Sequence, residues 1–299
     1  MSTIEAFFRT TSEKDLLGCY AWNQAIGARL LPLLADVEVS LRNALHRAVS
    51  QYFGKADSFD WMMPRANPVH AAHPTAPPFL PARHKLSPKS KDDVAVVMQK
   101  IRGRKPDGYV LTPDDIVAAL PLGFWEVLIG GLGHKSQPEG LQEAILAMVF
   151  PHAPDTLATP YGSPAFRQRV IDLLKRIREV RNRIGHHDAL WVTPEFNRTG
   201  VVGYFPRRPR HTVNSLRCFA GNICWFAGWI DPDISTYLRN SDHWWSLQLL
   251  LDRQALATYR RLGGAAGTCR TIIETADRPG QVKPRRKHRE RLIMQRYFY

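Results

Sequence analysis

The stretch RVIDLLKRIREVRNRIGHHDAL, residues Arg169 to Leu190, indicates the fold class more clearly than any other part of the chain. On a helix with about 100° between successive residues, its aliphatic side chains line up in one apolar stripe about 120° wide. This periodicity predicts an amphipathic helix, which we place from Ser163 to His187. The stripe consists of Val170, Leu173, Leu174, Ile177, Val180 and Ile184.

Polar side chains lie within and beside this stripe. Arg181 falls inside it, and an arginine that faces a core is costly unless it is paired or lines a polar cleft. Arg178, Asn182 and His186 follow one another at four-residue steps on the neighbouring face, where their side chains can converge. We therefore expect a polar site at the edge of the stripe.

Helical periodicity also dominates the rest of the chain, so the predicted fold class is mainly α. Thr112 is expected to cap one helix, because Pro113 follows it at the first helical position. The residues from Ala189 to Phe205 allow a short β-hairpin. The other expected helices are Trp22–Tyr52, Lys91–Ile101, Pro113–Ile129, Gln137–Val149, Asn214–Ile230 and Trp244–Leu262.

These elements predict a division of the chain at about residue 210. Residues 1–210 are expected to form a helical domain, interrupted by an irregular, proline-rich insertion at about residues 60–90. Residues 211–299 are expected to form a helical C-terminal extension. This extension ends in the basic tail KPRRKHRERLIMQRYFY, which is either a basic helix or a mobile arm.

The net charge of +14, from 41 Lys and Arg against 27 Asp and Glu, is concentrated in two segments. Residues 165–210 contain eleven basic and four acidic side chains, or +7, and residues 283–299 contain seven and one, or +6. Basic surfaces of this kind attract nucleic acids through counterion release. RNA is therefore the expected partner, although solvated basic residues without such a partner are the alternative.

Several classes of protein are excluded or disfavoured. The longest apolar stretch, from Cys218 to Ile230, has 13 residues, whereas a membrane span needs about 20. The acidic residues near the N-terminus do not fit a signal peptide, so we expect a cytoplasmic protein with no membrane contact. The four cysteines lack CxxC spacing, which disfavours a zinc ribbon or a disulfide framework and predicts reduced, mostly buried thiols.

The motif RNRIGH, from Arg181 to His186, resembles the Arg-Asn-x-x-x-His pattern of the HEPN superfamily of helical domains. Two other blocks, EVSLRNALHRAV from Glu38 and LPLGFWEVLIGGL from Leu120, occur with it in the order seen in Abi-like proteins of bacterial abortive infection. The resemblance covers about residues 10–190. It implies a HEPN-like helical bundle.

The resemblance also implies a metal-independent endoribonuclease. Arg181 is expected to hold the scissile phosphate, Asn182 to orient its neighbours and His186 to exchange the proton. RNA supplies its own nucleophile, the 2′-hydroxyl, so neither a metal nor another cofactor is implied, and an imidazole suits the proton transfer. The products carry a 2′,3′-cyclic phosphate and a 5′-hydroxyl, and a homodimer would place two Arg/His sets face to face.

Further residues are expected to bind RNA or to support the site. Glu38, Arg42 and His46 form a second ladder of four-residue steps, which we interpret as a buried polar support, with direct RNA contact as the alternative. The expected RNA-binding residues are Arg178, Arg183, Arg207, Arg208 and Arg210, of which the last three lie on a proline-rich extended segment or on a solvated loop.

The resemblance leaves two alternatives to an antiphage nuclease. One is a non-catalytic RNA-binding module, and the other is a toxin that an antitoxin protein or a small RNA regulator restrains.

Two more patterns are expected to be structural. Glu179 is expected to pair with Arg183 on the helix surface. The glycine-rich stretch GGLGHKS, from Gly130 to Ser136, lacks the GxxxxGK[ST] spacing and follows a predicted helix, so we expect no nucleotide there.

Overall fold

The computed structural model describes residues 4–53, 58, 60–62, 65–66, 72, 79–80, 86, 88–135 and 137–276. The chain forms two compact units, each assembled from segments that are distant in sequence. Unit 1 contains the described residues of Met1–Asp36, Arg176–Phe226 and Asp233–Tyr299, and unit 2 those of Val37–Lys175 and Ala227–Pro232. The predicted boundary at residue 210 falls inside unit 1.

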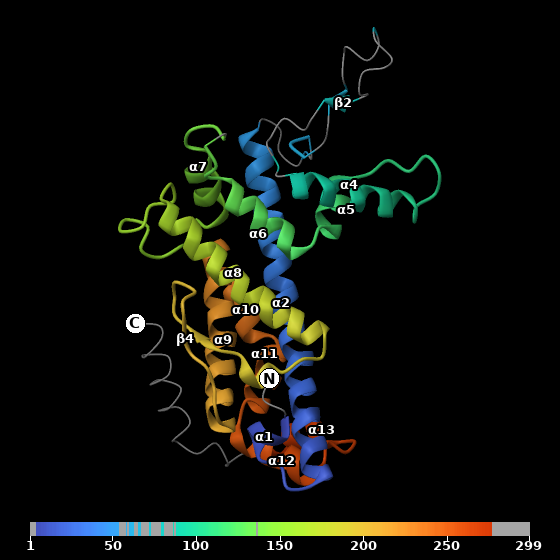
Figure 1. Cartoon of the computed structure of the whole chain (residues 1–299), viewed down its shortest axis with the longest axis vertical. Coiled ribbons are helices and arrows are strands. Elements are labelled where there is room, and N and C mark those ends of the chain that lie inside the picture. The colour runs from blue at the N-terminus through green and yellow to red at the C-terminus, as the bar shows by residue number, and fades with distance from the viewer. Residues whose placement is uncertain are drawn as a thin grey trace. The chain divides into compact units, whose positions relative to one another are not determined.

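The fold is mainly α, as predicted, and the described strands form only two small hairpins (Figure 1). Four helices contribute residues to both units: α2 (Glu13–Tyr52), α8 (Pro164–Gly185), α9 (Pro209–Ile230) and α10 (Pro232–Asn240). Most of α9 and α10 belongs to unit 1, and only a few of their residues belong to unit 2. The other elements of unit 1 are α1 (Ile4–Phe8), a 3-10 turn (Leu190–Val192), β3 (Glu195–Phe196), β4 (Val202–Tyr204), α11 (Asp242–Leu250), α12 (Arg253–Leu262) and α13 (Thr268–Ala276).

In unit 1 the start of α2 packs closely against α11 and α12. The indole of Trp22 donates a hydrogen bond to the carbonyl of Leu250 at 2.9 Å. A Cβ atom on Gly18 would lie 2.2 Å from the carbonyl oxygen of Tyr259, so only glycine allows this approach. Residues from opposite ends of the described chain thus share one core.

The predicted β-hairpin is present in unit 1, where β3 and β4 pair in antiparallel orientation. Asn197 forms the turn: its Oδ1 accepts hydrogen bonds from the backbone N–H groups of Thr199 and Val201, at 3.0 Å each. Gly200 takes a positive φ of 79° there, a conformation that glycine adopts without strain.

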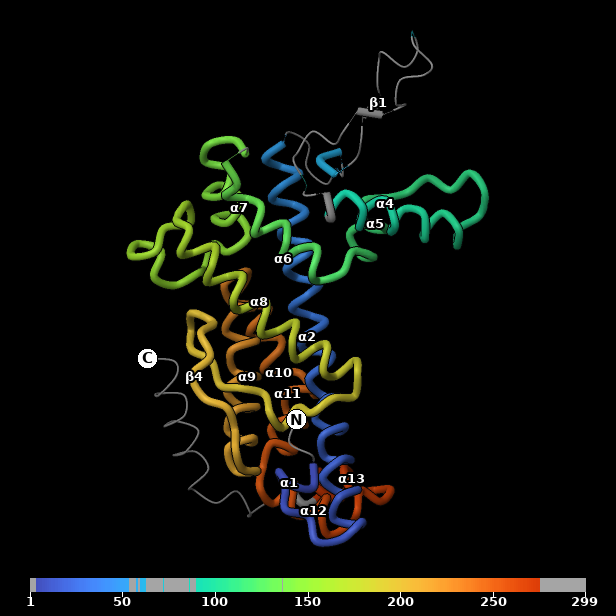
Figure 2. The backbone as a smooth tube through the Cα atoms, viewed as in Figure 1, coloured from blue at the N-terminus to red at the C-terminus, as the bar shows by residue number. Residues whose placement is uncertain are grey.

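Unit 2 contains β1 (Arg65–Ala66), β2 (Phe79–Leu80), α4 (Pro88–Arg102), α5 (Pro113–Ala119), α6 (Leu122–Gly131) and α7 (Leu141–Val149). Helices α4 and α5 lie side by side (Figure 2). Phe150, Phe166 and Trp229 form a buried aromatic cluster, in which the rings of Phe150 and Trp229 are 6.2 Å apart. The guanidinium of the buried Arg169 lies 4.7 Å from the Trp229 ring centre.

Local signals predicted the start of α5 correctly. The Thr112 side chain accepts a hydrogen bond from the backbone of Asp115, and the Asp115 carboxylate accepts one from the backbone of Thr112. The prediction of one helix to Ile129 was wrong, because α5 ends at Ala119 and α6 begins at Leu122. Pro121 explains the break, since proline disfavours the helical conformation of the residue before it.

Other helix boundaries also differ from the prediction. The expected helix from Trp244 to Leu262 is two helices, because Asp252 caps a new one by accepting a hydrogen bond from the N–H of Gln254. Helices α1, α10 and α13 were not predicted, and α9 begins at Pro209, five residues before the predicted start.

Two predicted segments lie largely or wholly outside the described residues: the insertion at about 60–90 and the basic tail at 283–299. Within the described residues, no helix has the length and apolar character needed to cross a bilayer. All four cysteines are free thiols, and burial raises the pKa of Cys19, Cys218 and Cys224 to about 12.

Candidate functional site

The motif residues Arg181, Asn182 and His186 lie at the C-terminal end of α8, and all three are exposed. The His186 N–H donates to the carbonyl of Asn182 at 2.9 Å, so the backbone keeps its helical path through His186. On such a path Arg178, Asn182 and His186 follow one another at steps of about 40° around the axis. Arg181 is about 140° around the axis from His186 and about 7.5 Å along it.

The exposure of Arg181 corrects one expectation from the sequence. The aliphatic residues of the predicted stripe are buried from Val170 to Val180, but Ile184 is only half-buried and Arg181 is exposed. Helical periodicity gives the direction of a side chain, whereas burial also needs a neighbour at that point along the axis. The last turn of α8 therefore presents its basic side chains at the surface.

The chain reverses direction immediately after the motif, at His187. This residue has a φ of 54°, in the left-handed region. The His187 N–H donates to the carbonyl of Ile184 and the Asp188 N–H to that of Arg183, a pair of bonds that defines a Schellman motif. Although Gly185 is the likelier helix terminator by residue type, it is the last helical residue, and a histidine occupies the strained position.

Two side chains of α2 hold this reversed segment in place. Asn23, only 2% exposed, donates from Nδ2 to the carbonyl of Asp188 at 3.3 Å and accepts from the N–H of Leu190 at 3.0 Å. Next to it, the Gln24 Oε1 atom lies 3.1 Å from Nδ1 of His187. Sequence analysis missed both residues. The available signal was a polar residue, Asn23, on the apolar face of a predicted helix.

A cavity of about 310 Å³ lies beside this segment, between α2 and the end of α8. Arg183 lines it, and its Nη1 donates to the carbonyl of Ala189 at 2.9 Å. The predicted pair between Glu179 and Arg183 is absent, because Glu179 pairs with Arg176 at 2.7 Å. Arg181, Asn182 and His186 do not line the cavity.

A second basic cluster, Arg207, Arg208 and Arg210, is exposed as well. The expected extended segment ends earlier than predicted, because Arg210 belongs to the first turn of α9. The Arg210 Nε atom donates to Nε2 of His211 at 3.1 Å, and the Tyr204 hydroxyl lies 2.5 Å from Nδ1 of the same ring. These contacts place the His211 imidazole beside the arginines.

The expected supporting ladder belongs to unit 2, whereas the motif residues belong to unit 1. Arg42 donates to the carbonyl of Ala118 at 3.2 Å. His46 is 7% exposed, and its Nδ1 accepts from the indole of Trp61 at 3.4 Å. Glu38 is half-buried. His46 is therefore part of a buried polar contact, whereas Glu38 and Arg42 are only half-buried, and the support of the motif by this ladder stays a prediction.

The described residues contain no group of three or more His, Cys, Asp or Glu side chains that could hold a metal ion. No protein-family model matches the chain, and searches of curated proteins and of solved structures gave no match. The resemblance to the HEPN superfamily and the roles that it implies therefore stay predictions.

Proposed function

We propose that the protein is a metal-independent endoribonuclease of bacterial antiphage defence, with Arg181 and His186 as its catalytic residues. The observation that carries the proposal is that Arg181, Asn182 and His186 are all exposed at the C-terminal end of α8, with Arg181 about 140° around the helix axis from His186. A polymeric substrate needs such an accessible site. The closed turn at His187 and its hydrogen bonds to α2 hold the end of the helix in one conformation.

The proposed reaction uses the 2′-hydroxyl of RNA as its nucleophile. His186 accepts the 2′-hydroxyl proton as the 2′-oxygen bonds to phosphorus, and the bond from phosphorus to the 5′-oxygen breaks. Arg181 donates two hydrogen bonds to the phosphate oxygens as negative charge develops on them. The leaving 5′-oxygen takes up a proton, which leaves a 2′,3′-cyclic phosphate and a 5′-hydroxyl.

A homodimer fits this chemistry. The reaction needs one group that accepts a proton and one that donates a proton, and each chain contributes one motif histidine. A second copy of α8 with its own Arg181 and His186 supplies the other set if the two helices meet about a two-fold axis.

RNA is the proposed substrate because basic side chains flank the motif on α8 and a second basic cluster lies in the same unit. Arg178 and Arg183 flank it on α8, and the exposed cluster of Arg207, Arg208 and Arg210 lies in the same unit. Such side chains position a phosphate backbone without reading its sequence. We propose a cytoplasmic protein, and the alternative is a toxin that an antitoxin or a small RNA regulator restrains.

The test is cleavage of bulk RNA in EDTA by the full chain. His186→Ala should lower the rate by about 10²- to 10⁴-fold, and Arg181→Lys should not restore it, because an ammonium lacks the bidentate fork. The matched controls are His152→Ala and Arg261→Lys, which change exposed side chains elsewhere and should leave the rate unchanged.

The same experiment separates the alternatives. RNA binding without cleavage by the unaltered protein, in the presence or absence of metal, supports a non-catalytic RNA-binding module. Cleavage by Arg181→Lys at the unaltered rate refutes the phosphate role of Arg181.

A further inference from the structure

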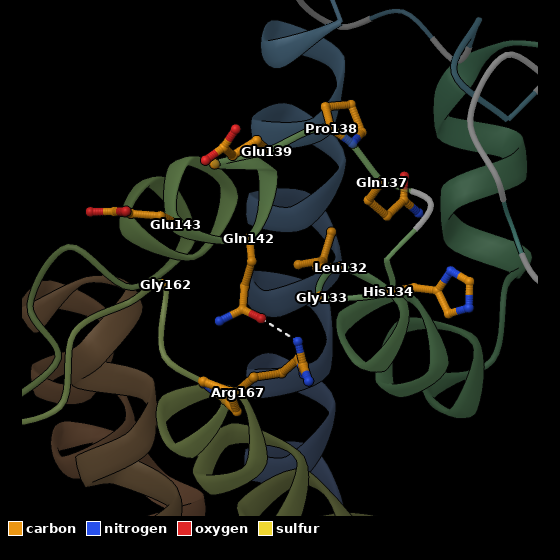
Figure 3. A pocket seen from close by; sticks show the side chains of 12 residues that line it. Leu132, Gly133, His134, Gln137, Pro138, Glu139, Gln142, Glu143, Gly162 and Arg167 are labelled. Carbon is orange, nitrogen blue, oxygen red and sulfur yellow. Dashed lines mark hydrogen bonds between the residues drawn. The ribbon is translucent and has the colours of Figure 1, made fainter.

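A second cavity, of about 350 Å³, lies in unit 2 (Figure 3). It is formed by the loop after α6, the start of α7 and the segment that leads into α8. Its lining includes Gly133 and His134 of the glycine-rich stretch for which the sequence predicted no nucleotide. Its volume lies at the lower end of the range of small-molecule sites, about 300–1,000 Å³.

A single arginine, Arg167, is held in a fixed position at this cavity. The Gln142 side chain is 7% exposed, and its Nε2 donates to the carbonyls of Tyr161 and Ser163, at 2.8 and 2.9 Å. Both amide hydrogens are thereby used, so Oε1 must face the other way. There it accepts a hydrogen bond from Nη1 of Arg167, drawn as a dashed line in Figure 3.

Gly133 provides the space that this guanidinium occupies. A Cβ atom at Gly133 would lie 1.2 Å from Nη1 of Arg167 and 2.6 Å from Oε1 of Gln142. Any larger residue would therefore displace the arginine. By contrast, a Cβ atom at the nearby Gly131 would have no neighbour within 4 Å.

The arginine has no carboxylate partner among the described residues, and Gln142 is the one side chain there that bonds to it. A guanidinium has five N–H donors, so most of them remain for a ligand. A half-buried cation that is held rigidly by a neutral amide is costly unless an anion compensates it. The anionic group of a ligand would provide that compensation.

The other charges of the cavity restrict what the ligand can be. Glu139 and Glu143 also line it, so the Glu and Arg side chains of the lining are two carboxylates and one guanidinium. In Figure 3 both carboxylates lie on the side away from Arg167. A simple anion would add to the negative charge, whereas a ligand with an anionic and a cationic end would match both sides.

We propose that this cavity binds a small zwitterion of the amino-acid type. Its carboxylate accepts a bidentate hydrogen bond from Arg167, and its ammonium group faces Glu139 and Glu143. Gln142 and Gly133 are positioning residues, since they act on the ligand through the arginine. The site is separate from the RNA motif and does not depend on the proposed nuclease function.

The test is saturation-transfer NMR on the full chain with the twenty free L-amino acids, followed by calorimetry for those that bind. At least one should bind, and its decarboxylated amine and its N-acetyl derivative should each bind at least tenfold more weakly. Arg167→Gln and Gly133→Ala should weaken binding at least tenfold, whereas Gly131→Ala should leave it unchanged.

Three results would overturn the proposal. The first is that no amino acid binds, and the second is that Arg167→Gln binds the amino acid as tightly as the unaltered protein does. The third is that acetate or inorganic phosphate binds as tightly as the amino acid, which would define a simple anion site. If Gly133→Ala does not fold, Arg167→Gln, with its thermal unfolding checked, decides the matter.

Discussion

Replacing Asn23 by alanine should release the segment that follows the motif. The change removes two hydrogen bonds, one to the buried N–H of Leu190 at 3.0 Å and one to the carbonyl of Asp188 at 3.3 Å. An unsatisfied buried N–H costs about 1–3 kcal/mol, and the longer bond to an exposed residue contributes about 0.5–1.5 kcal/mol. We therefore expect Asn23→Ala to lower the free energy of unfolding by about 1.5–4.5 kcal/mol.

Two measurements check this expectation. Urea denaturation gives the loss in global stability, and amide hydrogen exchange reports on the segment itself. The Leu190 amide should exchange at least about 10-fold faster than in the unaltered protein, because a loss of 1.4 kcal/mol corresponds to a factor of ten. Gln24→Ala is the matched control: it removes a more exposed contact to His187, so its cost should stay below about 1 kcal/mol.

The reasoning would be refuted if Asn23→Ala cost less than about 0.5 kcal/mol, or if Leu190 kept its protection. Either result would mean that water or another group replaces the lost partner. If the nuclease proposal also holds, Asn23→Ala should reduce RNA cleavage at temperatures at which the protein is still folded. Activity that is unchanged there would show that the segment after His186 does not position the catalytic groups.

Two other predictions concern the contact of α2 with α12. The guanidinium of Arg260 hydrogen-bonds to both carboxylate oxygens of Asp15 and lowers the pKa of Asp15 below its ordinary value of 3.8. The ion pair therefore stabilises the protein above pH 3.8 and loses its effect as the pH falls through the lowered pKa of Asp15. Urea denaturation should show that the unaltered protein is more stable than Asp15→Asn at neutral pH, and that this difference shrinks toward pH 2. Gly18→Ala should lower the free energy of unfolding, measured by urea denaturation, by at least about 2 kcal/mol, because the new Cβ would meet the backbone of Tyr259. The control Gly131→Ala should not destabilise the protein. A Gly18→Ala protein of normal stability would contradict this packing.

The sequence predicted those parts of the fold that short-range signals determine. The Thr112 cap and the aliphatic stripe of α8 up to Val180 are as expected, because capping and periodicity depend on residues a few positions apart. The hairpin followed in the same way from its turn residues. The division into two units could not be predicted in this way, because it depends on contacts such as that between Asp15 and Arg260.

The candidate site was predicted only in part. The sequence identified Arg181, Asn182 and His186, but periodicity placed Arg181 on the buried face, which the structure shows to be wrong. Asn23 was missed because its partners, Asp188 and Leu190, are more than 160 residues away. The cavity at Arg167 was missed for a similar reason, since it takes residues from three separate segments.

The discontinuity of unit 1 has a consequence for its synthesis. A ribosome finishes His186 before it begins α11 and α12, which pack with the start of α2. At about 5–20 residues per second, the roughly 90 residues from His186 to Ala276 take about 5–18 seconds. During that time the nascent polypeptide has its motif but not the helices that complete the surrounding core. A chain that stalls in this interval is a substrate for chaperones and proteases.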